Sequence, residues 1–555
     1  IREVLFNSHP KLKELVKGFS DNDLWQMTRG GHDPRKVYAA FSKAVEHKGQ
    51  PTVILVKTVK GYGMGQSGES ANVAHNQKKM DFESLKIFRD RFHVPLDNDQ
   101  LEELPFIRPS KDSPEYNFIH EQRKKLGGYL PSRQNKAKPI KIPSIDNFKT
   151  LLEGSGQKTM SSTMAFVRYL SILCRDKKIG KQIVPIVPDE ARTFGMEGLF
   201  RQIGIFAQFG QLYEPEDSEM FAWYKEDKTG QILEEGITEA GSLSSWIAAG
   251  TAYANYGINM IPFYTFYSMF GFQRIGDLAW AAGDIRARGF LMGATSGRST
   301  LNGEGLQHQD GHSHLLASTI PNCICYDPAF SYELVLIIQD GLKRMFSDQE
   351  DVFYYITIVN ENYIHPAMPQ GVEEGVIKGI YLFNNNCIKK QPVVQLMGSG
   401  SILNEVIEAS KLLQDDFNIS SNIWSVPGIN QLHKDGIECE RYNRMHPDKE
   451  TKIPYVTKIL KDHEGPAIIT TDYVRAYPEQ IRRFVPMKYH VLGTDGFGRS
   501  DTRENLRNFF EIGRYHIVIT ALNALKEEGI IKTKVIQSAL EKYDINPEKN
   551  NPVCS

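Results

Sequence analysis

The sequence has few of the features that mark a specialised class of protein. Its 555 residues include only six cysteines, and only Cys323 and Cys325 lie close together. This excludes a secreted disulfide scaffold and favours a reduced, cytoplasmic compartment, while the C-x-C segment between apolar neighbours predicts a buried strand. The formal net charge of −1 gives no bulk attraction to nucleic acid or to an anionic membrane, so we expect neither as a partner.

Long apolar runs and common nucleotide-binding signatures are also missing. No apolar run approaches the roughly 18 residues needed to cross a bilayer. The sequence has no phosphate loop of the form GxxxxGK[ST], and the glycines of its first glycine-rich loop do not follow the dinucleotide spacing G-x-G-x-x-G. With 41% hydrophobic and 24% charged residues, the composition is that of an ordinary globular protein, and the length predicts about three domains.

Short apolar runs that end in glycine or polar turns, followed by helical patterns, recur along the chain. This alternation predicts an α/β fold of parallel sheets flanked by helices. Ligands in such sheets bind beyond the carboxyl ends of the strands, and three unusually rich loops follow Val56, Val187 and Gly293. The expected strands are Val53–Val56, Ile183–Val187, Met260–Phe266, Gly289–Gly293, Val352–Val359 and Val393–Met397.

The segment from Gly293 to His314, GATSGRSTLNGEGLQHQDGHSH, is the most informative stretch. Its glycines allow backbone to approach a ligand, and His308, His312 and His314 carry groups that titrate near neutral pH. The segment therefore predicts a functional loop. A solvated glycine-rich turn is the plain alternative, and a metal site built from the three histidines is a weaker one, because no cysteine pair or HExxH helix accompanies them.

Lys57–Met80 is a second candidate loop, with three glycines in five residues. Lys60 and His75 are candidates for binding an anionic substrate and for proton transfer. An ordinary flexible surface loop remains the alternative.

Acidic and aromatic residues mark two further positions. Asp189 and Glu190 follow an expected strand, where they either face a cleft or cap a helix. Glu239 immediately precedes an apolar helix, so it is either stabilised by the helix dipole or a buried acid that protonates a ligand. Aromatic side chains crowd a strand end and its loop, forming either core or a flat pocket for a heterocycle. They are Tyr264, Phe266, Tyr267, Phe270 and Phe272.

Taken together, these segments closely resemble one family over the whole chain. The series KTVKGYGMG, NVAHNQKKM, PDEARTFGMEGLF, GITEAGSLSSW, IPFYTFYSMFGFQRIGDLAWAAGD and LNGEGLQHQDGHSH is similar to the homodimeric, bacterial-type pyruvate dehydrogenase. This is the thiamine-diphosphate-dependent decarboxylating component of the pyruvate dehydrogenase complex. The resemblance implies a transketolase-like α/β fold. The expected parts are a remnant of the diphosphate-binding domain (1–130), a linker (131–150), an aminopyrimidine-binding domain (151–371) and a transketolase-type C-terminal domain (381–555).

The resemblance also implies a mechanism and a set of site residues. Such enzymes decarboxylate pyruvate and acetylate a lipoyl-lysine of the acyltransferase component, in the bacterial cytoplasm, with thiamine diphosphate and Mg²⁺ as cofactors. Their active sites form between the subunits of a homodimer. Glu239 matches the catalytic glutamate that faces the pyrimidine ring. The other matches are Glu190, Tyr267 and Phe270 around that ring, His308 near the reacting carbon, and Lys60 and His75 on the substrate side.

Two departures from the family pattern stand out. Ala71 replaces a lysine expected two residues after Glu69, which affects expectations for loop ordering. No Gly-Asp-Gly signature occurs, so the oxygen ligands that would hold Mg²⁺ against the diphosphate are missing. Together with the non-methionine start, this absence predicts a chain that lacks most of the first domain. Two alternatives remain: a non-catalytic fragment that dimerises or docks, and a related enzyme acting on 2-oxoglutarate or a ketose phosphate.

Overall fold

The structure is a computed structural model that describes residues 1–27, 30–129, 137–188, 191–216, 224–388 and 390–555. The chain divides into two compact units, Ile1–Ser132 (unit 1) and Arg133–Ser555 (unit 2), which are described separately. No helix in the described ranges is long and apolar enough to cross a membrane.

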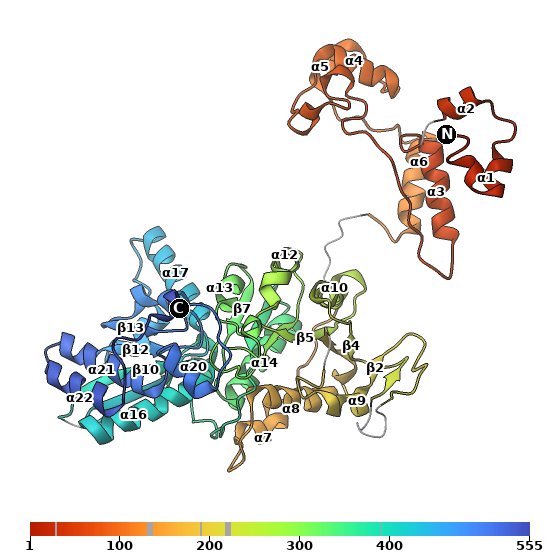
Figure 1. Cartoon of the computed structure of the whole chain (residues 1–555). Coiled ribbons are helices and arrows are strands. Elements are labelled where there is room, and N and C mark those ends of the chain that lie inside the picture. Colours follow the sequence, from red (N-terminus) through yellow and green to blue (C-terminus); the bar gives the residue numbers. More distant parts are fainter. Residues whose placement is uncertain (28–29, 130–136, 189–190, 217–223, 389) are drawn as a thin grey trace. The chain divides into compact units, whose positions relative to one another are not determined.

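Unit 1 consists of short helices and loops (Figure 1). Most of its helices begin at a Ser, Asp or His side chain that accepts a hydrogen bond from a first-turn amide, as helix N-caps do. The helices are α1 (Pro10–Leu15), α2 (Asp21–Gln26), α3 (Pro34–Glu46), α4 (Phe82–Arg91), α5 (Asn98–Glu103) and α6 (Pro114–Lys125).

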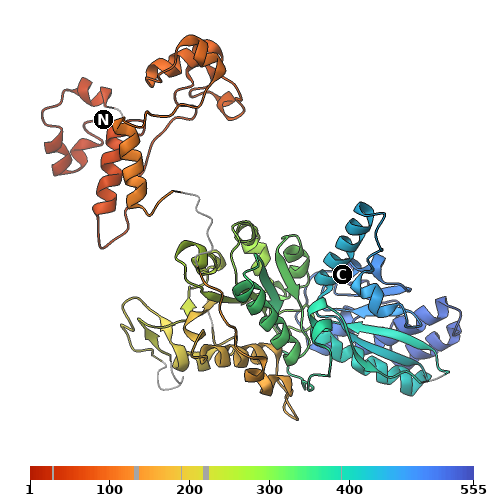
Figure 2. The ribbon, with the colours of Figure 1, turned by 180° about the vertical axis from the view of Figure 1, so that it is seen from behind.

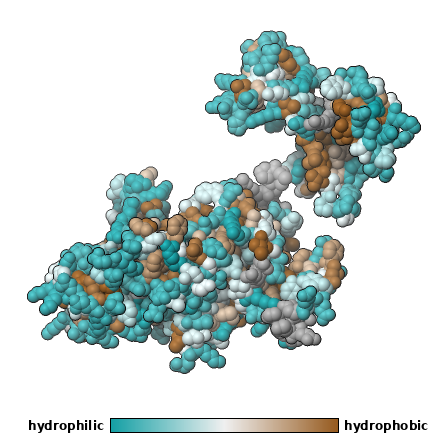
Figure 3. Space-filling model, in the orientation of Figure 1, coloured by the Kyte–Doolittle hydropathy of each residue, from teal (hydrophilic) through white to brown (hydrophobic). Residues whose placement is uncertain are grey.

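The predicted strand Val53–Val56 is wrong. The segment has no regular secondary structure, and Val53 and Leu55 are 80% and 92% exposed. A strand needs neighbours for its backbone hydrogen bonds, and no strand is present in the described part of unit 1. The brown surface over α3 and α6 in Figure 3 shows that apolar side chains of unit 1 face solvent as well. They include Tyr38, Phe41, Val45, Phe118 and Ile119.

Unit 2 contains a six-stranded parallel sheet with the order β4-β1-β5-β6-β8-β7. Its strands are nearly all buried, as expected for a sheet covered on both faces. Helices α8 (Ser162–Cys174) and α14 (Ser331–Leu342) pack on one face, and α10 (Glu239–Gly250), α12 (Gly271–Asp284) and α13 (Ser313–Ser318) pack on the other. The strands are β1 (Ile183–Val187), β4 (Leu233–Glu234), β5 (Ile261–Tyr267), β6 (Phe290–Ala294), β7 (Cys323–Tyr326) and β8 (Phe353–Thr357).

The second sheet of unit 2 has the order β13-β12-β10-β11-β9, in which only the edge strand β9 is antiparallel. Helices α16 (Leu403–Phe417) and α21 (Arg514–Glu527) cover one face, and α17 (Ile429–Met445) and α18 (Tyr455–Leu460) cover the other. Figure 2 shows the two sheets of unit 2 from behind. The strands are β9 (Tyr381–Asn385), β10 (Val393–Gly398), β11 (Ser420–Ser425), β12 (Ala467–Thr470) and β13 (Tyr489–Leu492).

The strand predictions for unit 2 are confirmed, with ends that differ by no more than a few residues. The expected runs become β1, β5, β6, β8 and β10, and the C-x-C segment becomes the buried strand β7. An α/β fold of mostly parallel sheets is therefore confirmed.

Candidate functional site

The loops that follow three neighbouring strands of the six-stranded sheet lie at the same edge of that sheet. Strands β1, β5 and β6 lie side by side and are parallel, so their carboxyl ends meet, which is where α/β sheets bind ligands. Strand β5 ends at Tyr267, Phe270 precedes α12, and the loop after β6 leads to His308. The residues after β1, Asp189 and Glu190, lie outside the described residues.

Four side chains from these segments form an aromatic cluster, defined here as Phe194, Tyr267, Phe270 and His308. The His308 ring lies edge-on to Phe270 and Tyr267, with centroid distances of 4.9 and 5.4 Å. Phe194 lies 5.3 Å from Tyr267. The Nδ1 atom of His308 is buried and has no hydrogen-bond partner among the described residues. A buried, unpartnered nitrogen is costly, so this atom is available to a ligand.

Glu239 lies beside this cluster at the first residue of α10. Its carboxylate, which is 12% exposed, receives a hydrogen bond of 2.6 Å from Arg274. The Arg274 guanidinium also stacks 4.1 Å from the centre of the Phe270 ring. Glu239 therefore begins a helix, where the dipole favours a negative charge, and its side chain is largely shielded from water. Its role in protonating a ligand stays a prediction.

This arrangement fits the aminopyrimidine half of thiamine diphosphate. A carboxyl group is present for the ring nitrogen, and aromatic faces from Tyr267 and Phe270 are present for the ring itself. For the diphosphate half, the described residues contain no group of three His, Cys, Asp or Glu side chains that could hold a metal ion.

The three histidines of the Gly293–His314 loop lie in three different environments. His308 joins the aromatic cluster, whereas His312 places Nδ1 3.4 Å from Nη2 of Arg298. His314 is fully buried between the sheets, where it stacks on Tyr477 and lies 2.9 Å from the Thr357 hydroxyl. Of the three histidines, only His308 lies in the aromatic cluster, and the function of this loop stays a prediction.

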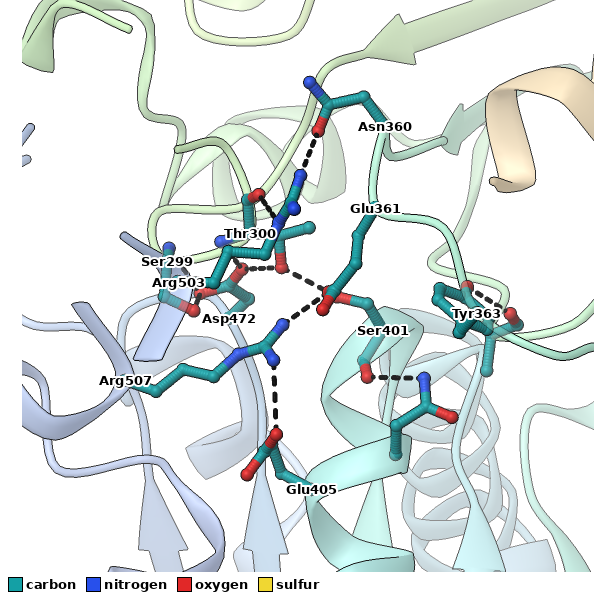
Figure 4. Close-up of polar contacts among 12 residues, drawn as sticks. Ser299, Thr300, Asn360, Glu361, Tyr363, Ser401, Glu405, Asp472, Arg503 and Arg507 are labelled. Carbon is teal, nitrogen blue, oxygen red and sulfur yellow. Dashed lines mark hydrogen bonds and ion pairs between the residues drawn. The ribbon is translucent and has the colours of Figure 1, made fainter. Parts of the chain in front are cut away.

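The first half of this loop is buried, so the alternative of a solvated turn is wrong for it. The Asp472 carboxylate, which follows β12 of the second sheet, accepts hydrogen bonds from the amides and hydroxyls of Ser299 and Thr300 at 2.5–2.8 Å (Figure 4). Burial raises the pKa of Asp472, while its hydrogen bonds to Thr300 and Ser299 lower it. Asp472 was not a candidate from the sequence, and its position directly after a buried strand is the only signal that pointed to it.

The hydrogen bonds of Asp472 with Ser299 and Thr300 are called the polar junction here. A second set of charged side chains lies next to it. Arg503 donates to the Thr300 carbonyl oxygen and to Asn360 at 2.7 and 3.2 Å. Arg507 is ion-paired with Glu361 and, at 3.2 Å, with Glu405 (Figure 4). Polar contacts rather than apolar side chains alone therefore connect the loop that carries His308 to the second sheet.

The candidate residues of unit 1 lie together in its glycine-rich loop. The Lys60 ammonium donates to Nδ1 of His75 at 2.8 Å, and both side chains are exposed. The Glu69 carboxylate accepts hydrogen bonds from the Gly63 amide at 3.1 Å and from Arg91 at 2.9 Å. The loop therefore presents a paired cation and imidazole to solvent.

Solved structures with the same fold are transketolases. The chain matches the transketolase from Campylobacter jejuni with a TM-score of 0.57 and 16% identity, covering 89% of this chain and 66% of that one. It matches a transketolase from Pichia stipitis with a TM-score of 0.58 and 14% identity, covering 90% and 68%. At these identities the likeness shows the fold alone, which is transketolase-like.

Two family models and several curated relatives match the sequence. Residues 140–366 match the pyruvate dehydrogenase E1 component middle domain, and residues 379–513 match the transketolase-like C-terminal domain. The pyruvate dehydrogenase E1 component of Pseudomonas aeruginosa is 58% identical over all of this chain, and that of Escherichia coli is 52% identical. The chain spans 63% and 62% of the length of these two relatives. By similarity along its whole sequence, the chain belongs to the family of bacterial pyruvate dehydrogenase E1 components.

Proposed function

We propose that the chain acts in the thiamine-diphosphate-dependent oxidative decarboxylation of pyruvate, with transfer of the acetyl group to a lipoyl-lysine of an acyltransferase. The observation that supports it most directly is the shielded Glu239 carboxylate beside the aromatic cluster, in a chain from this family. On this proposal, residues 151–371 bind the aminopyrimidine and residues 381–555 are the C-terminal domain. Residues 131–150 link them to residues 1–130, which are a C-terminal remnant of the diphosphate-binding domain.

Each site residue has a chemical task in this proposal. Glu239 holds or shares a proton at the pyrimidine nitrogen, and Tyr267 and Phe270 pack on the ring. When bound, the cofactor supplies the nucleophilic carbon and the electron sink for decarboxylation. The family resemblance assigns His308 to the vicinity of the reacting carbon and Glu190 to the vicinity of the pyrimidine ring. The His308 role is supported by its buried Nδ1, which has no hydrogen-bond partner among the described residues.

Lys60 and His75 belong to the substrate side of the proposed site. A lysine ammonium suits the carboxylate of a 2-oxo acid, and a neighbouring imidazole suits proton transfer during delivery of the acetyl group. The proposed assembly is a homodimer in the bacterial cytoplasm. The Mg²⁺ that would hold the diphosphate has no ligands in this chain on this proposal, because the sequence contains no Gly-Asp-Gly signature.

Pyruvate-dependent reduction of ferricyanide, in the presence of thiamine diphosphate and Mg²⁺, tests the substrate. We expect reduction with pyruvate and none with 2-oxoglutarate. The aromatic and small residues near Glu239 suit a short acid, because a second carboxylate would require an additional cation. A preference for 2-oxoglutarate from folded, cofactor-bound protein would contradict the proposal.

Replacing Glu239 with glutamine tests whether the Glu239 carboxyl group takes part in proton transfer. The variant Glu239→Gln is expected to lower the pyruvate-dependent rate by about 100-fold, because positioned acids and bases contribute factors of that order. The control is Asp284→Asn, which changes an exposed carboxylate at the last residue of α12. Equal rates for Glu239→Gln and the control, with both proteins folded by circular dichroism, would remove Glu239 from the mechanism.

A second candidate function is a non-catalytic role in dimerisation or docking. It is favoured by the absence of a Gly-Asp-Gly signature from the sequence and of a three-ligand cluster from the described residues. Calorimetric titration of the folded chain with Mg²⁺ and thiamine diphosphate separates the two candidates. A saturable, magnesium-dependent heat of binding would support the catalytic role. The absence of any heat of binding would support the role in dimerisation or docking.

A further inference from the structure

A cavity of about 600 Å³ opens on the surface of unit 2, away from the aromatic cluster. One wall is the segment that leads into the short helix Ile145–Phe148, and the other is the C-terminal end of α8 with the turn that follows it. No part of the proposed reaction uses it. The lining comprises Lys141, Ile142, Pro143, Ser144, Asn147, Phe148, Ile172, Leu173, Arg175, Asp176, Lys177 and Lys178.

The charge of this cavity is strongly one-sided. Lys141, Arg175, Lys177 and Lys178 supply four positive charges, and Asp176 supplies the only negative one. The Asp176 carboxylate is engaged within the turn, where it accepts hydrogen bonds from the Lys178 and Ile179 amides at 2.8 and 3.0 Å. None of the four cations forms an ion pair with a residue in the described part of the chain.

The floor of the cavity is apolar and firmly held. Phe148 is fully buried and stacks on Tyr169 at 4.2 Å. Leu173 is also fully buried, and Ile142 and Ile172 are partly exposed at the surface of the cavity. The site therefore combines a preformed apolar floor with a rim of solvent-exposed cations.

The end of α8 explains only part of this charge. Cations near the C-terminus of a helix complement its dipole, which accounts for Arg175, Lys177 and Lys178. Lys141 lies on a different segment, and its presence at the same opening is not explained by the helix. Four cations from two walls therefore line the cavity together with a single carboxylate, Asp176.

We propose that this cavity docks an acidic segment of a partner polypeptide whose aliphatic side chains rest on the floor. A polypeptide fits better than a small molecule, because small ligands are mostly enclosed by their pockets, whereas the four cations here are exposed. Charge complementarity of this kind steers association and gives it a strong dependence on salt. The proposal is independent of the proposed catalytic function.

The test uses a fluorescent synthetic peptide in which glutamates alternate with leucines, titrated into the whole chain and followed by anisotropy. The triple variant K141E/K177E/K178E is expected to weaken binding by about tenfold or more, as reversal of close charges does. The control K526E/K532E/K534E changes the formal charge by the same amount at exposed lysines of unit 2 outside the cavity.

The outcomes separate the proposal from its alternatives. Selective loss in the first variant, with no binding of a matched peptide in which glutamine replaces glutamate, supports docking of an acidic segment. Equal loss in both variants, no binding by the unaltered chain, or displacement of the peptide by inorganic tripolyphosphate at equal concentration would overturn it. Melting temperatures of all three proteins establish that each is folded.

Discussion

Replacing Asp472 with alanine is expected to lower the free energy of unfolding of unit 2 by about 4 kcal/mol, because removing one partner of a buried charged network leaves the others unsatisfied. The carboxylate is 4% exposed and accepts four hydrogen bonds from Ser299 and Thr300. Without it, two amides and two hydroxyls lose their acceptor. Urea unfolding followed by tryptophan fluorescence measures the change.

The isosteric variant Asp472→Asn and a surface control sharpen this test. In Asp472→Asn an NH₂ group replaces one carboxylate oxygen and would face the amide and hydroxyl donors of Ser299 or Thr300. We therefore expect Asp472→Asn to lose most of the unfolding free energy that Asp472→Ala loses. Asp495, which pairs with Arg475 at the surface, is the matched control, and Asp495→Asn is expected to cost less than about 1 kcal/mol. A loss for Asp472→Ala no larger than for the control would contradict the role of the junction.

His365 is expected to make unit 2 sensitive to acid. Its Nδ1 accepts a hydrogen bond from the Ser331 amide at 2.9 Å, and its Nε2 donates to the Met160 carbonyl oxygen at 2.8 Å. This fixes the neutral ring, since a proton on Nδ1 would face the Ser331 N–H. Burial lowers the pKa of His365 from 6.5 to about 4, with a smaller contribution from Arg168, while the Met160 hydrogen bond acts in the opposite direction.

The sign of the pH effect follows from this depressed pKa. Between pH 6.5 and pH 4, His365 is protonated in the unfolded chain but stays neutral in the folded chain. Its contribution to the free energy of unfolding is therefore complete above pH 6.5 and is lost as the pH falls towards 4. The loss from this residue is about 3 kcal/mol over that interval. Thermal unfolding between pH 7 and pH 4.5 measures it.

Variants identify the histidine responsible. In His365→Gln the acid-dependent loss from this group is expected to disappear, so the stability difference from the unaltered chain narrows as the pH falls. His446, which is exposed on α17's C-terminal side, is the control, and His446→Gln is expected to keep the original pH profile. An unchanged profile in His365→Gln would contradict the assignment.

Most strands of the six-stranded sheet were predictable, because they are short apolar runs between glycines and polar turns. In the second sheet only β10 was predicted, because strands such as β11 (SSNIWS) are rich in polar residues. Runs such as Ile183–Val187 and Val393–Met397 carry the signal of buried parallel strands in their composition. Val53–Val56 carries the same local signal and forms no strand. The local residue pattern indicates only that a segment has a high propensity for a strand. Whether a strand forms also depends on neighbouring strands that can accept and donate its backbone hydrogen bonds.

The candidate site was predictable where its residues lie in loops that follow neighbouring parallel strands. Tyr267 ends β5, Phe270 lies in the loop after it, and His308 lies in the long loop after β6; the structure brings the three into contact. Arg274 and Asp472 were not identified as contacts, because their partners Glu239 and Ser299 lie far away in the sequence. No periodicity or spacing encodes such pairings. The assignment of catalytic roles rests on family resemblance, since spacing alone does not distinguish Glu239 from an ordinary helix-capping acid.

The contact between Ser299 and Asp472 has a consequence for the order in which the protein is made. The two residues are separated by 173 positions, and domains emerging from a ribosome fold from the N-terminal side. The six-stranded sheet is therefore fully synthesised while the loop that carries His308 still lacks its acceptor. The nascent chain therefore anchors the loop that carries His308 only after β12 and Asp472 have left the ribosome.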